Sequence, residues 1–125
     1  TGWGAHCVQA HPAGSNFGGS ATVAIYHSEG KFSLMRNLGG SNFFTGTKPI
    51  ESNKWYHIRL FVKWSTGTDG LISLYIDDMV NPYVTYKGRT QADNSLPYWK
   101  CGQNNWGSSQ GIPILYDNFT IFSRK

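Results

Sequence analysis

The stretch WYHIRLFVKW, residues 55–64, alternates apolar and polar side chains along its length. Successive side chains of a β-strand point to opposite faces, so the apolar side chains share one face while Arg59 and Lys63 share the other. The next six residues, STGTDG at 65–70, are turn formers. Because LISLYI at 71–76 repeats the alternation, the whole segment predicts an antiparallel β-hairpin.

A second hairpin is predicted around SEGK at residues 28–31, where Gly30 can take the positive φ that a tight reversal requires. Its strands would cover residues 22–27 and 32–36. Further strands are expected at residues 5–10, 98–103 and 114–122. The segments 12–20 and 39–47 are rich in Gly, Ser and Asn and predict loops, whereas 83–94 has no clear pattern.

The composition of the 125 residues favours one all-β domain, covering residues 1–125. The chain contains 15 Gly, 15% aromatic residues and only 14% charged residues, which is typical of short strands joined by turns. The excess of 11 Lys and Arg over 7 Asp and Glu favours anionic partners such as an acidic polysaccharide. The basic residues are scattered, so no nucleic-acid partner is expected, and no apolar run of about 20 residues predicts a membrane span.

Four motifs carry a resemblance to a known family. They are QAH at 9–11, NKWYH at 53–57 with VKWS at 62–65 and DGL at 69–71, YWKCGQN at 98–104, and YDNFTI at 116–121. In type and order they resemble the jelly-roll polysaccharide lyases that act on alginate, heparin and glucuronan. The resemblance implies an antiparallel β-sandwich jelly roll of the concanavalin A-like kind. It also implies that the strands of Gln9 and Tyr98 are neighbours in the concave, sugar-facing sheet.

One position of the resemblance departs from the family pattern. In such lyases the Gln neutralises the uronate carboxyl group, the His can act as base, and the last residue of the YWKCGQN-like motif is a Tyr that moves the proton. Here that last residue is Asn104. Because an amide does not titrate near neutral pH, it can bind a sugar hydroxyl but cannot shuttle the proton. We therefore expect no catalytic residue.

The expected site is a groove on the concave sheet. Gln9, His11, Lys100 and Asn104 would make polar contacts with the sugar, and Trp106 would stack on a pyranose ring. No metal or other cofactor is expected, since the Cys and His spacings do not match a metal site. The pair Asp77-Asp78 is interpreted as a turn rather than as a pair of catalytic acids.

The sequence also predicts a secreted glycoprotein with a partner chain. Asn118-Phe119-Thr120 is an N-glycosylation sequon, which makes Asn118 the expected attachment site. The strands with which such lyases usually begin have no counterpart before Gln9, so we expect a second polypeptide or a second copy to complete the sandwich. A reduced sandwich of about eight strands is the alternative.

Cys7 and Cys101 leave three possibilities open: a bridge between them, a bond to another chain, or two free thiols. If Gln9 and Lys100 both face the groove, Cys7 and Cys101 point to opposite faces, and a direct bridge needs a bulge or a register break.

The leading hypothesis for function is a secreted carbohydrate-binding protein, a lectin, with a glycan as ligand. The alternative is a working polysaccharide lyase on uronic-acid polymers, with His11 as base and a tyrosine outside the motif, such as Tyr26, as acid. A third interpretation is a structural or partner-binding subunit with a vestigial groove.

Overall fold

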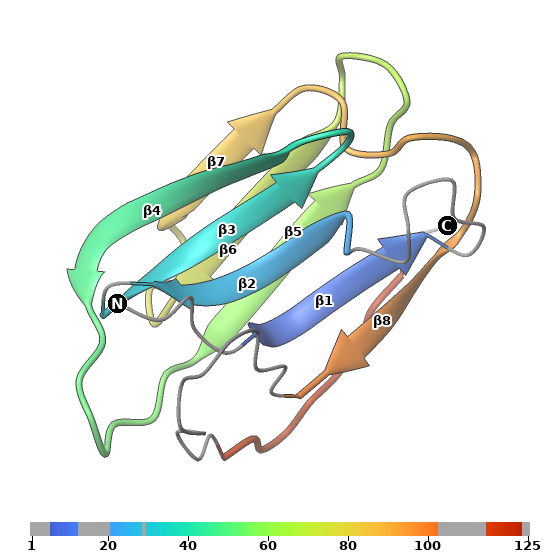
Figure 1. The fold of residues 1–125 in the computed structure, drawn as a ribbon. Helices are drawn as coiled ribbons and strands as arrows, with labels where there is room; N and C mark the ends of the chain where they lie inside the picture. Colours follow the sequence, from blue (N-terminus) through green and yellow to red (C-terminus); the bar gives the residue numbers. More distant parts are fainter. Residues whose placement is uncertain (1–5, 13–20, 29, 103–114, 124–125) are drawn as a thin grey trace.

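The computed structural model describes residues 6–12, 21–28, 30–102 and 115–123, and in these ranges the regular structure consists of eight strands without a helix (Figure 1). The strands are β1 (His6–Pro12), β2 (Val23–Ser28), β3 (Lys31–Asn37), β4 (Ser41–Pro49), β5 (Ile58–Lys63), β6 (Leu71–Ile76), β7 (Val84–Lys87) and β8 (Pro97–Cys101).

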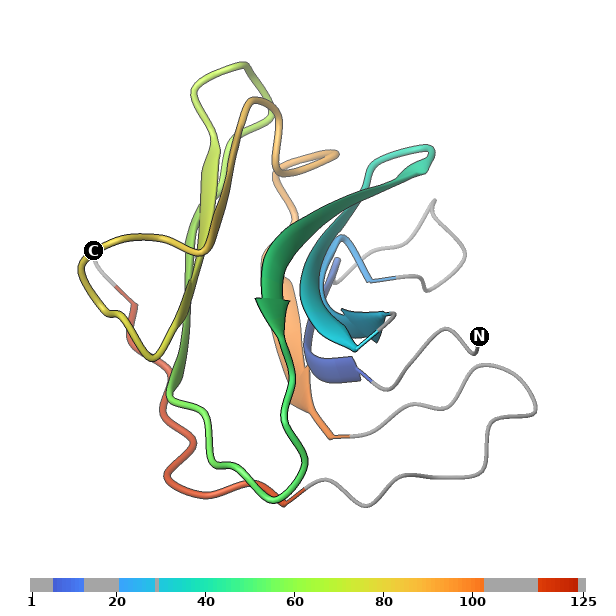
Figure 2. The same cartoon turned by 90° about the vertical axis from the view of Figure 1, so that its left-hand side faces the viewer.

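The strands form two antiparallel sheets that face each other. The five-stranded sheet has the order β4-β3-β2-β1-β8, and the three-stranded sheet has the order β5-β6-β7. Figure 2 shows the sheets edge-on, with β2, β3 and β4 curving around the face that is turned away from the three-stranded sheet. We call this concave side of the five-stranded sheet the outer face. The expected all-β antiparallel sandwich is confirmed.

The core lies between the two sheets because one side of each strand is apolar. Ile25 and Leu34 from the five-stranded sheet and Ile72 and Leu74 from the three-stranded sheet are fully buried there. Burying one such side chain contributes about 1.5–3 kcal/mol to stability. This burial specifies which face of every strand points inward, and therefore which side chains are left for the outer face.

Both predicted hairpins are present. β5 pairs with β6 from Ile58 opposite Ile76 to Lys63 opposite Leu71. β2 pairs with β3, and Gly30 between them has a φ of 71°, as the tight reversal requires. The predicted neighbourhood of the Gln9 and Tyr98 strands is also confirmed, because β1 pairs directly with β8.

The prediction of a loop at residues 39–47 is wrong, because β4 runs through most of this segment. β4 is an edge strand with much of its surface exposed, so it needs few apolar residues. Its Gly46 packs directly under the ring of Tyr83, at a place where a Cβ atom would overlap the ring. The glycine that suggested a loop therefore serves close packing. Tyr83 leads into β7, which lies in the segment without a clear pattern.

The prediction of a strand at residues 114–122 is also wrong for residues 115–122, which the structure describes. Residues 115–123 form no strand, and Phe119 is exposed. Asn118 has a φ of 52°, which lies in the left-handed region and interrupts an extended chain. The first hairpin strand also begins at Ile58 rather than at Trp55, which is exposed.

Gly70 provides a test of the packing at the start of β6. A Cβ atom on Gly70 would lie 2.6 Å from Thr90 Oγ1 and would overlap the carbonyl oxygen of Gly88. Thr90 Oγ1 accepts a hydrogen bond from Ser65 N and donates one to Lys63 O, each 2.8 Å long. A shift of Thr90 away from the added Cβ atom would therefore break these hydrogen bonds. We expect Gly70→Ala to lower the free energy of unfolding by about 1–3 kcal/mol in urea titrations.

The matched control is Gly67→Ala in the same loop, where the nearest atoms lie 3.6 and 3.7 Å from the added Cβ, an ordinary contact distance. Equal stability losses in both variants would contradict this account of the packing.

Candidate functional site

A row of side chains crosses the outer face from edge to edge. The pairing of adjacent strands places Gln9 opposite both Lys100 and Ala24, Ala24 opposite Met35, and Met35 opposite Phe43. The row therefore contains one residue from each of the five strands. We call it the central row; it consists of Lys100, Gln9, Ala24, Met35 and Phe43.

Alternation along β1 and β8 puts the polar side chains of these strands on the outer face. Val8 and Ala10 pack against the core from β1, and Trp99 does so from β8. The residues between them must point the other way. Gln9, His11 and Lys100 thus lie on the outer face, where they were expected, and Tyr98 lies there with them.

Gln9 and His11 are joined by a hydrogen bond of 2.8 Å between His11 Nε2 and Gln9 Oε1. An amide oxygen only accepts, so Nε2 of His11 carries the hydrogen. The two residues are only 5% and 6% exposed, respectively. The two side chains form a buried polar pair, called the polar floor below. Buried polar groups need hydrogen-bond partners, and each of these side chains provides one for the other. The bond occupies Nε2, so this nitrogen cannot take a proton from a substrate while the bond persists.

Tyr98 and Lys100 stand beside this floor. The Tyr98 ring stacks on the His11 ring, with centroids 5.3 Å apart and an interplanar angle of 20°. The Lys100 ammonium lies 5.5 Å from the centre of the Tyr98 ring. Tyr98 is 46% exposed and Lys100 is exposed, so both can meet a ligand from solvent. The four residues Gln9, His11, Tyr98 and Lys100 are called the polar cluster below.

Tyr98 was not among the predicted site residues. The sequence did indicate on which face Tyr98 lies, because Tyr98 and Lys100 are two residues apart on one strand and must share a face. What the sequence could not supply was the register that places Tyr98 opposite His11.

Comparison with models of protein families assigns the chain to one of them. The family model described as polysaccharide lyase matches residues 6–120, which is nearly the whole chain. The chain belongs to the polysaccharide lyase family. No curated protein and no solved structure matches it.

In this polysaccharide lyase family member, two predicted site residues fall outside the described residues. Asn104 and Trp106 lie in the segment 103–114, so their part in the site stays a prediction. Within the described ranges, no three His, Cys, Asp or Glu side chains are grouped to hold a metal ion. In the same ranges no helix is long and apolar enough to cross a membrane.

Tyr26, named as the acid of the alternative lyase mechanism, also lies on the outer face but at a different point. His11 is two residues from Gln9 in one direction, and Tyr26 is two residues from Ala24 in the other. With roughly 3.3 Å per residue, the two lie about 13 Å apart along the strands. Side chains of a strand extend roughly perpendicular to the sheet, so the side chains of His11 and Tyr26 keep this separation. They therefore do not reach the same glycosidic bond. Burial raises the pKa of the Tyr26 hydroxyl.

The remaining residues named by the sequence analysis are the two cysteines and the sequon at Asn118. Cys101 pairs with Val8 in the sheet and is a free, exposed cysteine, and partial burial raises the pKa of its thiol. The side chain of Cys7 lies outside the described residues. Asn118 is exposed, together with Phe119 and Thr120 of the sequon.

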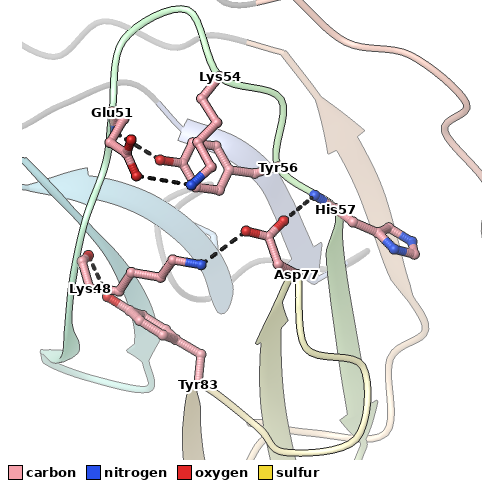
Figure 3. A network of polar contacts seen from close by, with 7 residues as sticks. All are labelled: Lys48, Glu51, Lys54, Tyr56, His57, Asp77 and Tyr83. Carbon is pink, nitrogen blue, oxygen red and sulfur yellow. Dashed lines mark hydrogen bonds and ion pairs between the residues drawn. The ribbon is translucent and has the colours of Figure 1, made fainter.

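A second polar network, which includes Lys48 of β4, ties the two sheets together (Figure 3). Lys48 of β4 forms an ion pair of 2.9 Å with Asp77, which follows β6 and also accepts a hydrogen bond of 3.0 Å from His57 N. The Tyr83 hydroxyl donates to Lys48 O at 3.2 Å. Next to them, the backbone N–H of Glu51 donates a hydrogen bond to the Tyr56 hydroxyl, and the Glu51 carboxylate accepts one from Lys54 Nζ.

The interpretation of Asp77-Asp78 as a turn is confirmed. Asp77 has a φ of 62°, and Asp78 Oδ1 accepts hydrogen bonds from Val80 N at 2.8 Å and Asn81 N at 3.0 Å. Each carboxylate is therefore committed to the turn or to Lys48, and this network is structural.

Asp77→Asn tests that assignment. The hydrogen bond from Lys48 and then that from His57 N lower the pKa of Asp77, so its charge stabilises the fold above the ordinary aspartate pKa. This contribution disappears as the pH falls through the lowered pKa. Because both partners of the ion pair are exposed, we expect Asp77→Asn to cost at most ~1 kcal/mol at neutral pH and nothing in acid, measured by urea unfolding.

Asn tolerates a positive φ and can still accept from His57 N, so the change isolates the charge. Lys48→Met should lose the same amount, and the double variant should lose no more than either single one. Additive losses would contradict an ion pair as the source.

Proposed function

We propose that this domain binds an acidic polysaccharide on its outer face and does not cleave it. Membership of the polysaccharide lyase family supports a carbohydrate-related function. The observation that carries the proposal is the polar cluster of Gln9, His11, Tyr98 and Lys100, which gathers amide, imidazole, phenol and ammonium groups on the concave sheet.

Three members of the polar cluster suit parts of a sugar acid. The Lys100 ammonium attracts a carboxylate or sulfate group, in keeping with the net charge of +4. The Gln9 amide nitrogen is a donor of the kind that suits sugar hydroxyl groups. The exposed part of the Tyr98 ring offers apolar surface to sugar C–H groups, and its hydroxyl offers a further hydrogen bond.

Two observations favour binding over cleavage. β-Elimination needs a base for the proton next to the carboxyl group and an acid for the leaving oxygen. At the family's tyrosine position the chain has Asn104, whose amide cannot do either. Nε2 of His11 donates its hydrogen to Gln9 and cannot accept a proton while that bond persists.

Lyase activity is the second candidate function, and one contact favours it. The Tyr98 ring lies against His11, so a phenol and an imidazole adjoin on the outer face without Asn104. In that case His11 would release Gln9 and act as base, while the Tyr98 hydroxyl would act as acid.

Secretion and a partner chain belong to the same proposal. The exposed sequon at Asn118 supports N-glycosylation, which takes place in the secretory pathway. The exposed Leu115, Phe119 and Phe122 of the closing segment support a contact with a second polypeptide or copy. Native mass spectrometry tests both: a monomer of unmodified mass from the natural source would contradict them.

Binding is tested by titrating oligouronates into the protein and into variants of the polar cluster. Removing one hydrogen-bonding side chain from a desolvated site costs about 1–3 kcal/mol, so Gln9→Ala should weaken binding roughly 5- to 100-fold. Lys100→Met should also weaken binding, and should make it less sensitive to added salt. Gln91→Ala, in the loop before β8, is the matched control and should bind as the wild type does.

Asn104→Ala is expected to weaken binding as well. A wild-type protein that binds none of alginate, glucuronan and heparin would contradict the proposal.

Cleavage is tested by following the ultraviolet absorbance of unsaturated uronates during incubation with the same three polymers. We expect no increase. Tyr98→Phe and Tyr98→Ala separate the two functions: the phenylalanine keeps the ring and should retain most of the binding, whereas alanine should not. An absorbance increase in the wild type that Tyr98→Phe and His11→Ala both abolish would establish the lyase instead.

A further inference from the structure

The closing segment, residues 115–123, carries exposed apolar side chains that the proposed sugar site does not use. Leu115, Phe119, Ile121 and Phe122 are 76%, 51%, 54% and 89% exposed, respectively. Single exposed apolar residues are normal on a protein surface, whereas a group so close together in the chain favours an interaction site.

The closing segment lies away from the outer face. Figures 1 and 2 show it, in red, on the side of the five-stranded sheet where the three-stranded sheet also lies. A contact made by the closing segment therefore leaves the polar cluster open to a ligand, and the two can be tested separately.

The second half of the closing segment, Phe119-Thr120-Ile121-Phe122, has the composition of a β-strand. Aromatic and β-branched residues favour strands, and this stretch contains no Gly, Pro or charged residue. Residues 115–123 nevertheless form no strand. An exposed segment of high β-propensity that belongs to no sheet is suited to pair with the identical segment of another chain. This property favours a second copy of the chain as the partner of the closing segment.

Asn118 lies immediately before this stretch. Its φ of 52° is in the left-handed region, and its backbone N–H donates a hydrogen bond of 2.8 Å to Asp117 Oδ1. Asn118, Phe119 and Thr120 are all exposed, so the sequon is accessible to modification. The proposed glycosylation site thus adjoins the residues that favour strand pairing.

An N-glycan at Asn118 would be attached next to Phe119. Such a glycan is bulky and carries a layer of water. Strand pairing requires the two backbones to approach to about 4.8 Å, and the glycan would keep a second chain from coming so close. Natural sequences protect apolar strand-forming segments with gatekeeper residues that flank them, and a glycan in this position would have the same effect.

We propose that the closing segment pairs with the closing segment of a second copy when Asn118 is unmodified, and that an N-glycan at Asn118 prevents this pairing. The inference rests on the proposed glycosylation of Asn118 and the proposed partner contact, and it adds that the one excludes the other. It does not depend on sugar binding at the polar cluster.

The test compares the same chain produced with and without N-glycosylation, by sedimentation velocity at a series of micromolar concentrations. The chain without the glycan should associate, and the glycosylated chain should associate at least about tenfold more weakly. In the glycosylating host, Thr120→Ala removes the sequon and should restore association. Thr120→Ser is the matched control, because it keeps the sequon and should behave as the glycosylated wild type does.

A second set of variants tests whether the closing segment makes the contact. In the chain without the glycan, Phe119→Ser and Phe122→Ser should each weaken association about tenfold or more, since each removes a large apolar side chain from the interface. Val80→Ser is the control. Val80 is 82% exposed in the turn after β6, outside the closing segment, and its replacement should leave association unchanged.

The outcomes separate this inference from the functions proposed above. Monomers in both forms, equal association in both forms, or association that survives Phe119→Ser and Phe122→Ser would each refute the inference, and oligouronate binding would still decide the sugar-binding function. If mass spectrometry finds Asn118 unmodified in the glycosylating host, the proposed glycosylation and this inference fail together. Association controlled by the glycan in a chain that binds no oligouronate would support the inference and refute the sugar-binding function.

Discussion

The pairing of β1 with β8 is the constraint on which the candidate site depends. Ala10 and Trp99 lie opposite each other in this pair and pack into the core. A slip of one residue would turn Gln9 and His11 into the core and bring apolar side chains to the outer face, so the alternative register is strongly disfavoured. Burial of two apolar residues thus brings Gln9 to Lys100 and His11 to Tyr98.

Polar groups serve two different purposes in this domain. Asp77 and Lys48 connect the two sheets at one end of the three-stranded sheet, and at its other end Thr90 connects β5 and the loop after it to the segment before β8. These contacts are directed at other protein groups. On the outer face, by contrast, Tyr98 and Lys100 remain exposed around a floor of Gln9 and His11. This difference is the reason for assigning recognition to the outer face alone.

The sequence predicted those parts of the fold in which burial on one side imposes strict alternation. Both hairpins and the inward faces of β5 and β6 belong to this class. β4 was missed because its Ser, Asn and Gly residues suit an exposed edge as well as a loop, and only Tyr83, far away in sequence, explains Gly46. The closing segment was mispredicted because its apolar residues suggested a strand, whereas Asn118 adopts a left-handed conformation.

The candidate site was predictable to a similar degree. Gln9, His11 and Lys100 follow from motifs and from alternation along each strand. The contribution of Tyr98 and the position of Phe43 depend on which residues of different strands lie opposite each other, and this information is not contained in any single motif.

Chemical-shift mapping by nuclear magnetic resonance, during titration with an acidic oligosaccharide, tests the central claim most directly. The account predicts that the largest changes occur at the Gln9 side-chain amide, the His11 ring and the backbone of Tyr98 and Lys100, and that Phe61 and Arg59 on the three-stranded sheet do not change. Changes concentrated on the three-stranded sheet, or none at the polar cluster at saturating ligand, would contradict it.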